Sequence, residues 1–123
     1  MPTLSIRVDL RPGASIGPGK ARLLELIAET GSISAAARAM EMSYRRAWLL
    51  IDDLKAVFGE AVVETAAGGA KGGGAHLTRR GRTVLDAFRR VERAAAKAAA
   101  RDIPPTPLAE AARGAPRRMP RTR

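Results

Sequence analysis

The sequence contains no cysteine, a single histidine (His76) and only 3% aromatic residues. Without cysteine the chain forms neither disulfides nor thiolate metal sites, and one histidine argues against a histidine-based zinc or iron site. No apolar run is long enough for a membrane span. The start of the chain has neither a basic nor an apolar segment, so no secretory signal is predicted. We therefore expect a cytoplasmic protein that has no metal and does not act at a membrane.

Acidic residues are also scarce, with 12 Asp and Glu against 22 Lys and Arg, which gives a net charge of +10. The excess is uneven, because residues 1–77 carry +1, residues 78–101 carry +6 and residues 102–123 carry +3. A nearly neutral body with a basic C-terminal third favours a polyanionic partner, with nucleic acid slightly ahead of a merely solubilising basic helix and tail.

No set of residues suggests catalysis. Asp52 and Asp53 are adjacent in a predicted helix, where neighbouring side chains point about 100° apart and do not share a proton. His76 has no acidic or serine partner at a useful spacing. Without a nucleophile and base, or a metal cluster, we predict that the protein is not an enzyme.

Hydrophobic periodicity and capping residues predict seven elements in the order β-α-α-α-β-β-α. The expected elements are a half-buried strand over 4–10, helices over 18–30, 33–40 and 44–58, strands over 61–65 and 75–77, and a helix over about 78–101. In the first strand, alternation places Leu4, Ile6, Val8 and Leu10 on one face, which we expect to be the buried one. From residue 102 the chain is rich in Pro and Arg and has no periodicity, which predicts a disordered basic tail. We expect one domain over 1–101, followed by the tail over 102–123.

The short helix, tight break and longer helix of residues 32–58 have the helix-turn-helix pattern. Alanine on the first helix permits close packing, and the second helix presents its start to a DNA groove, where Arg binds guanine or phosphate. An ordinary pair of antiparallel helices is the alternative, but the glycine-rich hairpin that follows favours a winged helix-turn-helix. The predicted DNA-binding residues are Ser32, Ser34, Ser43, Tyr44, Arg45, Arg46, Trp48, Lys71, Arg79 and Arg80.

The glycine-rich stretch over 67–74 allows three interpretations. It lacks the G-x-x-x-x-G-K-[ST] spacing of a phosphate-binding loop, and no helix begins directly after it. A wing whose backbone and Lys71 reach a minor groove or a phosphate is favoured over a plain hairpin tip.

The last predicted helix carries a heptad-like apolar seam on a highly basic sequence. At about 36 Å, a helix of some 24 residues is too long for one small domain to cover. The seam therefore predicts a homodimer with two recognition helices on a two-fold axis. The predicted dimerisation residues are Leu77, Val84, Phe88, Val91, Ala95 and Ala98.

Three segments carry a resemblance to a known family. Residues 31–37 (GSISAAA) resemble the helix-turn-helix opening of LysR-type regulators and of ModE, the molybdate-responsive regulator family. Residues 43–48 (SYRRAW), and residues 63–75 with 77–81, are similar to ModE in particular. The resemblance covers about residues 4–100 and implies a mainly α winged-helix domain that dimerises through its N-terminal strand and long last helix. It also implies control of molybdenum-uptake or molybdoenzyme genes.

The chain departs from the ModE pattern after the last helix, where that family usually carries molybdate-binding β-barrels. We therefore expect no cofactor, no molybdate binding by this chain, and constitutive binding of double-stranded DNA, with control by expression level or by a separate molybdate-sensing regulator chain. Two alternatives stay open. One is a protein-interaction partner that heterodimerises with a full-length regulator, and the other is a non-specific architectural DNA binder.

Overall fold

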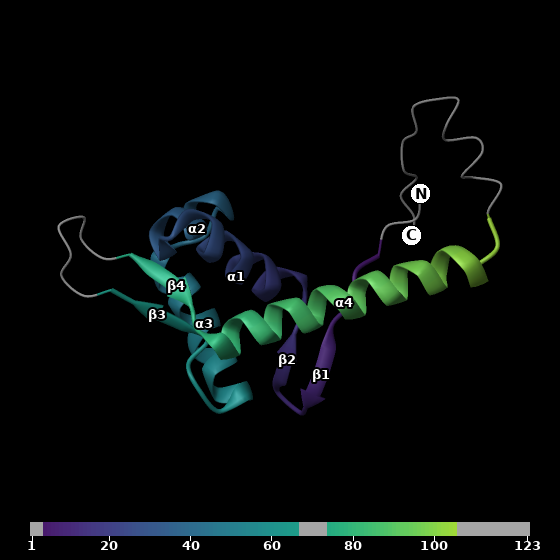
Figure 1. Ribbon diagram of the computed structural model, residues 1–123, viewed down its shortest axis with the longest axis horizontal. Coiled ribbons are helices and arrows are strands. Elements are labelled where there is room, and N and C mark those ends of the chain that lie inside the picture. The colour runs from purple at the N-terminus through teal and green to yellow at the C-terminus, as the bar shows by residue number, and fades with distance from the viewer. Residues whose placement is uncertain (1–3, 67–73, 106–123) are drawn as a thin grey trace, which may run out of the picture.

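The computed structural model describes residues 4–66 and 74–105 and is mainly helical, with two small antiparallel sheets (Figure 1). Three helices precede a hairpin, and a long helix follows it. In chain order the elements are β1 (Val8–Arg11), β2 (Ala14–Ile16), α1 (Pro18–Thr30), α2 (Ile33–Ala39), α3 (Tyr44–Phe58), β3 (Val63–Thr65), β4 (Ala75–Leu77) and α4 (Arg79–Asp102). The predicted winged helix-turn-helix architecture with a long C-terminal helix is confirmed.

Helix α1 is the centre of the fold. Leu23, Leu24 and Ile27 are fully buried, because α2 and α3 pack on one side of α1 and α4 packs on another. Gly31 ends α1 with φ +71°, a left-handed conformation that glycine adopts without strain. The chain thereby turns at once into α2.

Side-chain caps fix where the next two helices begin. The Ser32 hydroxyl oxygen accepts a hydrogen bond from the Ala35 amide, and the Ser43 hydroxyl oxygen accepts one from the Arg46 amide. Between them, Glu41 takes a positive φ of 58°. This tight turn sets α3 across α2.

The hairpin of β3 and β4 is held to the helix-turn-helix by its backbone. Val63 pairs with Leu77 and Thr65 with Ala75, and the Ala75 amide donates a 2.8 Å hydrogen bond to the Gly31 carbonyl. Figure 1 shows the hairpin at the same end of the molecule as α2. The hairpin therefore has the position of a wing.

The N-terminal strand differs from its prediction. A single strand was expected over 4–10, whereas β1 begins at Val8 and pairs with β2, which was not predicted. The pairing arises because Pro12 and Gly13 do more than end a strand: Gly13, at φ +78°, reverses the chain into a hairpin. The predicted order is thus preserved, with one additional strand before α1.

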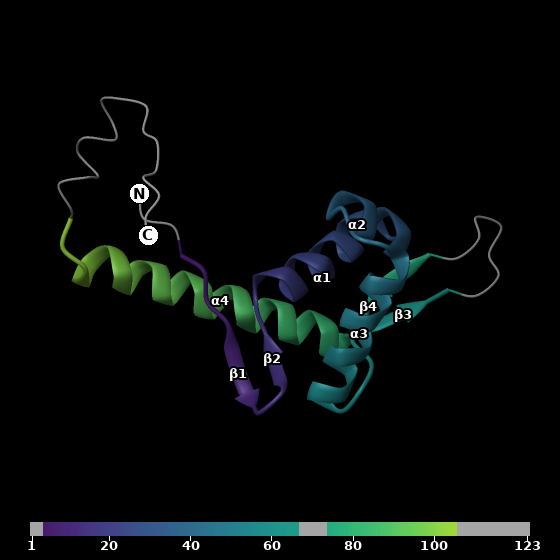
Figure 2. The same ribbon diagram turned by 180° about the vertical axis from the view of Figure 1, so that it is seen from behind.

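Thr78 caps the start of helix α4, and its hydroxyl donates to the Ala61 carbonyl and accepts from the Gly81 amide. The first half of α4 packs on the core through the buried Val84, Leu85 and Phe88. Its second half extends beyond the body of the domain (Figure 2). Across the described segments, no helix combines the length and apolar character that crossing a membrane requires.

Candidate nucleic-acid interface

The first turn of α3 presents cationic side chains to solvent. Arg45 and Arg46 are exposed, and neither guanidinium has an ion pair with another described residue. Ala47, Ile51 and Leu54 bury the opposite face of the helix in the core. The guanidinium groups are therefore accessible from solvent, and guanidinium groups bind phosphate oxygens and base edges.

The serines of this end have two different roles. Ser32 and Ser43 use their oxygens as helix caps, so their first role is structural. Ser34 is exposed, and with Tyr44 and Thr65 it lines a polar hollow of about 100 Å³ between α2, α3 and β3. Thr65 was not among the predicted site residues, because only the hairpin pairing brings it to the start of α3.

The aromatic pair on α3 combines a supported residue with an exposed one. Trp48 is half-buried against the core, and the Tyr44 ring meets its edge at a centroid distance of 6.4 Å and an angle of 78°. Edge-to-face pairs of this kind are favourable. Trp48 thus packs against the ring of Tyr44, which is exposed at the surface.

The remaining predicted cations lie around the base of the wing. Lys71 falls outside the described residues. Arg79 is exposed and has no ion pair within the part of the chain that the structure describes, whereas Arg80 pairs with Glu60 at 3.1 Å. The side chain of Arg79 is therefore the more available of the two for a phosphate.

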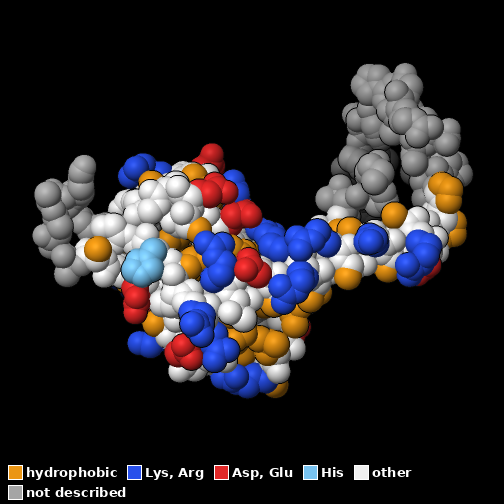
Figure 3. All heavy atoms as spheres, viewed as in Figure 1, with side chains coloured by type: hydrophobic (Ala, Val, Ile, Leu, Met, Phe, Trp, Pro, Cys, Tyr) orange, Lys and Arg blue, Asp and Glu red, His pale blue; other side chains and the backbone are white. Residues whose placement is uncertain are grey.

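A row of cations continues along α4 beyond the wing. Figure 3 shows Lys and Arg side chains gathered along this helix, on the side turned away from the core. Arg90, Arg93 and Lys97 of α4 are exposed. The excess of basic residues over 78–101 thus lies on one helix.

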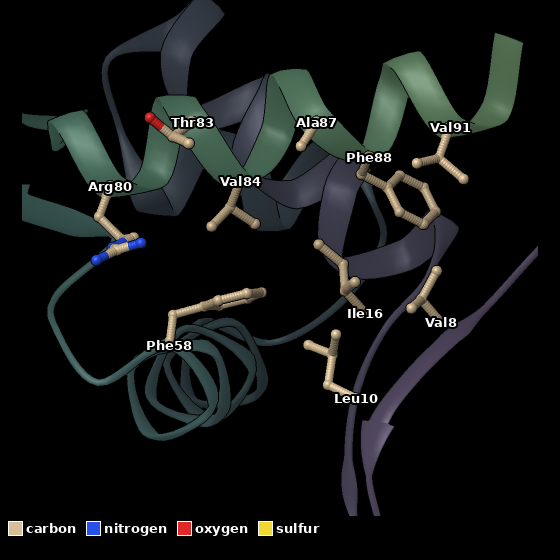
Figure 4. Close-up of a pocket in the computed structure, with 10 residues that line it drawn as sticks. All are labelled: Val8, Leu10, Ile16, Phe58, Arg80, Thr83, Val84, Ala87, Phe88 and Val91. Atoms are coloured by element: carbon tan, nitrogen blue, oxygen red, sulfur yellow. The ribbon is translucent and has the colours of Figure 1, made fainter. Parts of the chain in front are cut away.

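An apolar groove lies on the other side of α4. It has a volume of about 240 Å³ and lies between β1, the end of α3 and α4 (Figure 4). Leu10 and Val91 form exposed parts of its wall, and Val84 and Phe88 form buried parts. Figure 3 shows apolar side chains gathered beside α4, above the N-terminal hairpin.

The predicted dimerisation residues divide between the core and this surface. Val84 and Phe88 are at least 93% buried within one chain, and Leu77 is half-buried. Val91 is exposed, and Ala95 and Ala98 are partly exposed on the extending half of α4. Leu10 is an addition: its strand alternation suggested a buried face, but the structure leaves it 49% exposed at the groove.

An ionic cluster fixes α4 against α1. Glu25 accepts hydrogen bonds from Arg22 at 2.7 Å and from Arg89 at 3.0 Å, and Arg89 also donates to Glu92 at 2.7 Å. The hydrogen bond from Arg22 lowers the pKa of Glu25 most, and the charge of Arg89 lowers it further, whereas burial opposes both effects without reversing the direction. The hydrogen bond to Glu92 raises the pKa of Arg89.

The described residues contain no group of three or more metal-ligating side chains. His76 is exposed and lies 3.3 Å from Glu64 across the β3–β4 hairpin, and Asp53 lies 4.0 Å from Lys20. These pairs are surface contacts and form no catalytic set.

Comparison with known proteins agrees with this geometry. Residues 19–82, more than half of the chain, match the family model described as bacterial regulatory helix-turn-helix protein, lysR family. The chain belongs to this family. The match begins in α1 and ends in the first turn of α4, so it contains the helix-turn-helix and the hairpin. Membership in the lysR helix-turn-helix family places the chain among DNA-binding transcriptional regulators, not among enzymes.

Curated relatives of this lysR-family chain include molybdenum-pterin-binding proteins and ModE regulators. It is 41% identical over 87 residues to the molybdenum-pterin-binding protein MopB of Rhodobacter capsulatus. This alignment covers 71% of this chain and 32% of MopB. It is 44% identical over 71 residues to the transcriptional regulator ModE of Yersinia pestis, and 39% identical over 71 residues to the DNA-binding transcriptional dual regulator ModE of Escherichia coli. Each ModE alignment covers 58% of this chain and 27% of the relative. The chain thus spans between about a quarter and a third of the length of the relatives it matches, and its ModE resemblance is confirmed.

Proposed function

We propose that this chain is a homodimeric, sequence-specific regulator of molybdenum-uptake or molybdoenzyme genes. The observation that carries the proposal is the exposed first turn of α3, where Arg45 and Arg46 are free of ion pairs within the described chain. The names of the relatives support the link to molybdenum.

In the proposed mode of binding, α3 enters a major groove and the β3–β4 wing lies against the neighbouring backbone. Arg45 and Arg46 contact base edges or flanking phosphates. The hydroxyls of Ser34, Tyr44 and Thr65 surround a hollow of about 100 Å³ that suits a backbone phosphate oxygen. Arg79 adds a phosphate contact at the base of the wing, and Lys71 is proposed to add one through its tip.

The second copy in the proposed dimer covers the apolar groove between β1 and α4. An exposed apolar groove is characteristic of an association surface. The extending half of α4 offers what can fill it, because six alanines between Ala94 and Ala100 give a thin helix that approaches another surface closely. If the extending half of α4 of each copy enters the groove of the other copy, the two contacts are related by a two-fold axis and form a closed, self-complementary interface.

Binding and selection test the DNA function directly. Purified chain is mixed with a random duplex library, and the bound sequences are recovered over several rounds at physiological salt. We expect a two-fold symmetric sequence that competes at least about 10³ times better than random DNA. Equal competition by all sequences, with a steep salt slope, would establish the architectural DNA binder instead.

The heterodimer alternative gives a different outcome in the same assay. The chain alone would then select no DNA sequence, and it would select one only when mixed with a full-length ModE-type regulator.

The link to molybdenum is tested in cells by deleting the gene and measuring transcripts of molybdate-uptake genes. Unchanged transcripts, together with selected sites elsewhere in the genome, would overturn that link.

We further propose that the 123-residue chain binds no molybdate selectively and that a separate sensor chain or expression level supplies control. A selective oxyanion site needs several fixed donors that replace water. The polar hollow at Ser34 has no Lys or Arg among its lining residues. Calorimetric titration with molybdate, with sulfate as the control, tests this proposal, and micromolar molybdate-selective binding contradicts it.

A further inference from the structure

Apolar side chains are exposed at the start of the recognition helix, where cations would be expected. Large, strongly exposed apolar residues of the described chain are Leu10, Tyr44, Leu49, Val91 and Ile103. Leu10 and Val91 line the groove, and Ile103 follows the end of α4. The other two lie in the first two turns of α3, and of these Tyr44 has an aromatic partner in Trp48. Leu49, 48% exposed, remains without a structural role.

Leu49 lies on the outward face of α3. It follows the buried Ala47 by two residues, which turns it about 200° away from the core at 100° per residue. Arg45 precedes it by four residues, and side chains at this spacing are neighbours on one face, about 5–6 Å apart. A cation and an isobutyl group thus stand side by side on the surface that faces DNA in the proposed complex.

We infer that Leu49 is a specificity-determining residue that reads the 5-methyl group of thymine. This inference rests on the proposed binding of α3 in the major groove. The thymine methyl is the apolar group that a base pair presents in that groove, and aliphatic side chains recognise it by burial. A phosphate or a base-edge acceptor offers an aliphatic group no apolar contact, so the thymine methyl is the feature of the groove that suits the exposed Leu49.

The spacing on α3 also predicts where the thymine lies. Cβ atoms of helical residues four apart, as Arg45 and Leu49 are, lie about 5–6 Å from each other, and bases along one strand are separated by about 3.4 Å. The thymine that contacts Leu49 therefore lies within about two base pairs of the base or phosphate that Arg45 contacts. Each half-site of the selected duplex is expected to contain this thymine.

The experiment removes the methyl from the DNA and the side chain from the protein, separately and together. Affinity for the selected duplex is measured by fluorescence anisotropy with thymine, and with deoxyuridine at the predicted position. Losing one buried methyl is expected to weaken binding about fourfold per half-site. Leu49→Ala is expected to weaken binding to the thymine duplex by at least as much, and to make the two duplexes bind equally.

Two variants control for folding and for general apolar surface. Leu49→Met keeps an aliphatic contact and is expected to retain the preference for thymine over deoxyuridine. Ile103→Ala removes an exposed apolar side chain far from α3 and is expected to change neither affinity nor preference. Thermal unfolding of all three variants is expected to match that of the parent, because none of these side chains is buried.

Each contrary outcome has one meaning. If Leu49→Ala preserves the fourfold preference, or if the selected half-site has no thymine near the Arg45 contact, the inference about Leu49 is wrong while the DNA-binding function stands. If no sequence is selected at all, the proposed function itself fails. The two failures are thereby distinguished.

Discussion

The two exposed surfaces of this domain differ in chemistry although they belong to the same small fold. At the start of α3 the exposed groups are guanidinium and hydroxyl groups, with Leu49 among them. Along the groove between β1 and α4 the exposed apolar groups are aliphatic, with Leu10 and Val91 in the wall. The first surface keeps its polar groups in water until a polyanion replaces that water. The second surface gains free energy only when another apolar surface covers it. One surface is therefore suited to DNA and the other to protein.

Charge placed in the groove is expected to have the largest effect. Leu10→Glu combined with Val91→Glu puts carboxylates into the proposed contact, and we expect sedimentation to show a monomer. Because a monomer engages one half-site, its affinity for the symmetric duplex is expected to fall by about 10² or more. These positions are preferable to Phe88, whose burial in the core would confuse dissociation with unfolding.

A matched charge on another helix controls for this change. Ala28→Glu introduces a carboxylate at an exposed position of α1, outside the groove. It is expected to leave the dimer intact. A Leu10→Glu/Val91→Glu protein that sediments as the same dimer would show that the dimer contact lies outside the groove.

The second largest effect is expected at the close contact between Gly81 of α4 and the backbone of Val62, where a substitution lowers the stability of the fold. Gly81 is buried where α4 passes the β3 end, and a Cβ built on it would overlap the carbonyl oxygen of Val62. Gly81→Ala is expected to destabilise the fold by about 1–3 kcal/mol or more. Since 1 kcal/mol shifts the Tm of a domain of this size by about 4–8 °C, circular dichroism melting will detect the change.

Gly19→Ala is the control for Gly81→Ala. Gly19 lies in the first turn of α1, and a Cβ there meets nothing within 4 Å. The alanine is expected to raise the Tm slightly, because it restricts the unfolded chain and favours helix. Equal melting of both variants would contradict the close approach at Val62.

Loss of a single arginine separates base contacts from phosphate contacts at the α3 surface. Arg45→Ala is expected to weaken binding to the selected duplex by about 1–3 kcal/mol and to relax the sequence preference at one position. Arg79→Ala is expected to weaken binding to all sequences alike and to reduce the salt slope by about one unit. If Arg45→Ala instead weakened binding to all sequences alike and Arg79→Ala changed the sequence preference, α3 would not lie in the groove as proposed.

The sequence predicted the helices more accurately than it predicted the surfaces. Serine caps predicted where α2 and α3 begin, and glycines predicted where α1 and α3 end, because these signals act within a few residues. The alternation over 4–10 identified an apolar face but not what covers it, so Leu10 was expected to be buried. The β1–β2 pairing was missed because Pro12 and Gly13 fit a strand end as well as a hairpin turn.

The candidate site shows the same limit. Arg45 and Arg46 were predicted because position on a helix determines their exposure. Thr65 was missed because it reaches the start of α3 only through the long-range pairing of β3 with β4. The sequence also did not separate the capping role of Ser43 from a DNA contact, since both need the same hydroxyl at the same position.

The smallest expected effect concerns Glu25, which links α1, beside the first surface, to α4, beside the second. Its pKa is lowered in the folded protein, chiefly by the hydrogen bond from Arg22 and by the charge of Arg89. A lowered pKa in the folded state means that the carboxylate stabilises the fold above the ordinary glutamate value of 4.5. This contribution is lost as the pH falls through the lowered value.

Glu25→Gln is therefore expected to lower the free energy of unfolding by no more than about 1 kcal/mol at pH 7, because the group is partly exposed. The Tm difference from the parent is expected to shrink in acid, whereas Glu29→Gln, whose carboxylate is 4.0 Å from Arg22, is expected to show almost no difference at either pH. A Tm difference between Glu25→Gln and the parent that is independent of pH would mean that the Glu25 side chain acts by packing and not by charge. The contact between α1 and α4 at Glu25 would then be apolar in character.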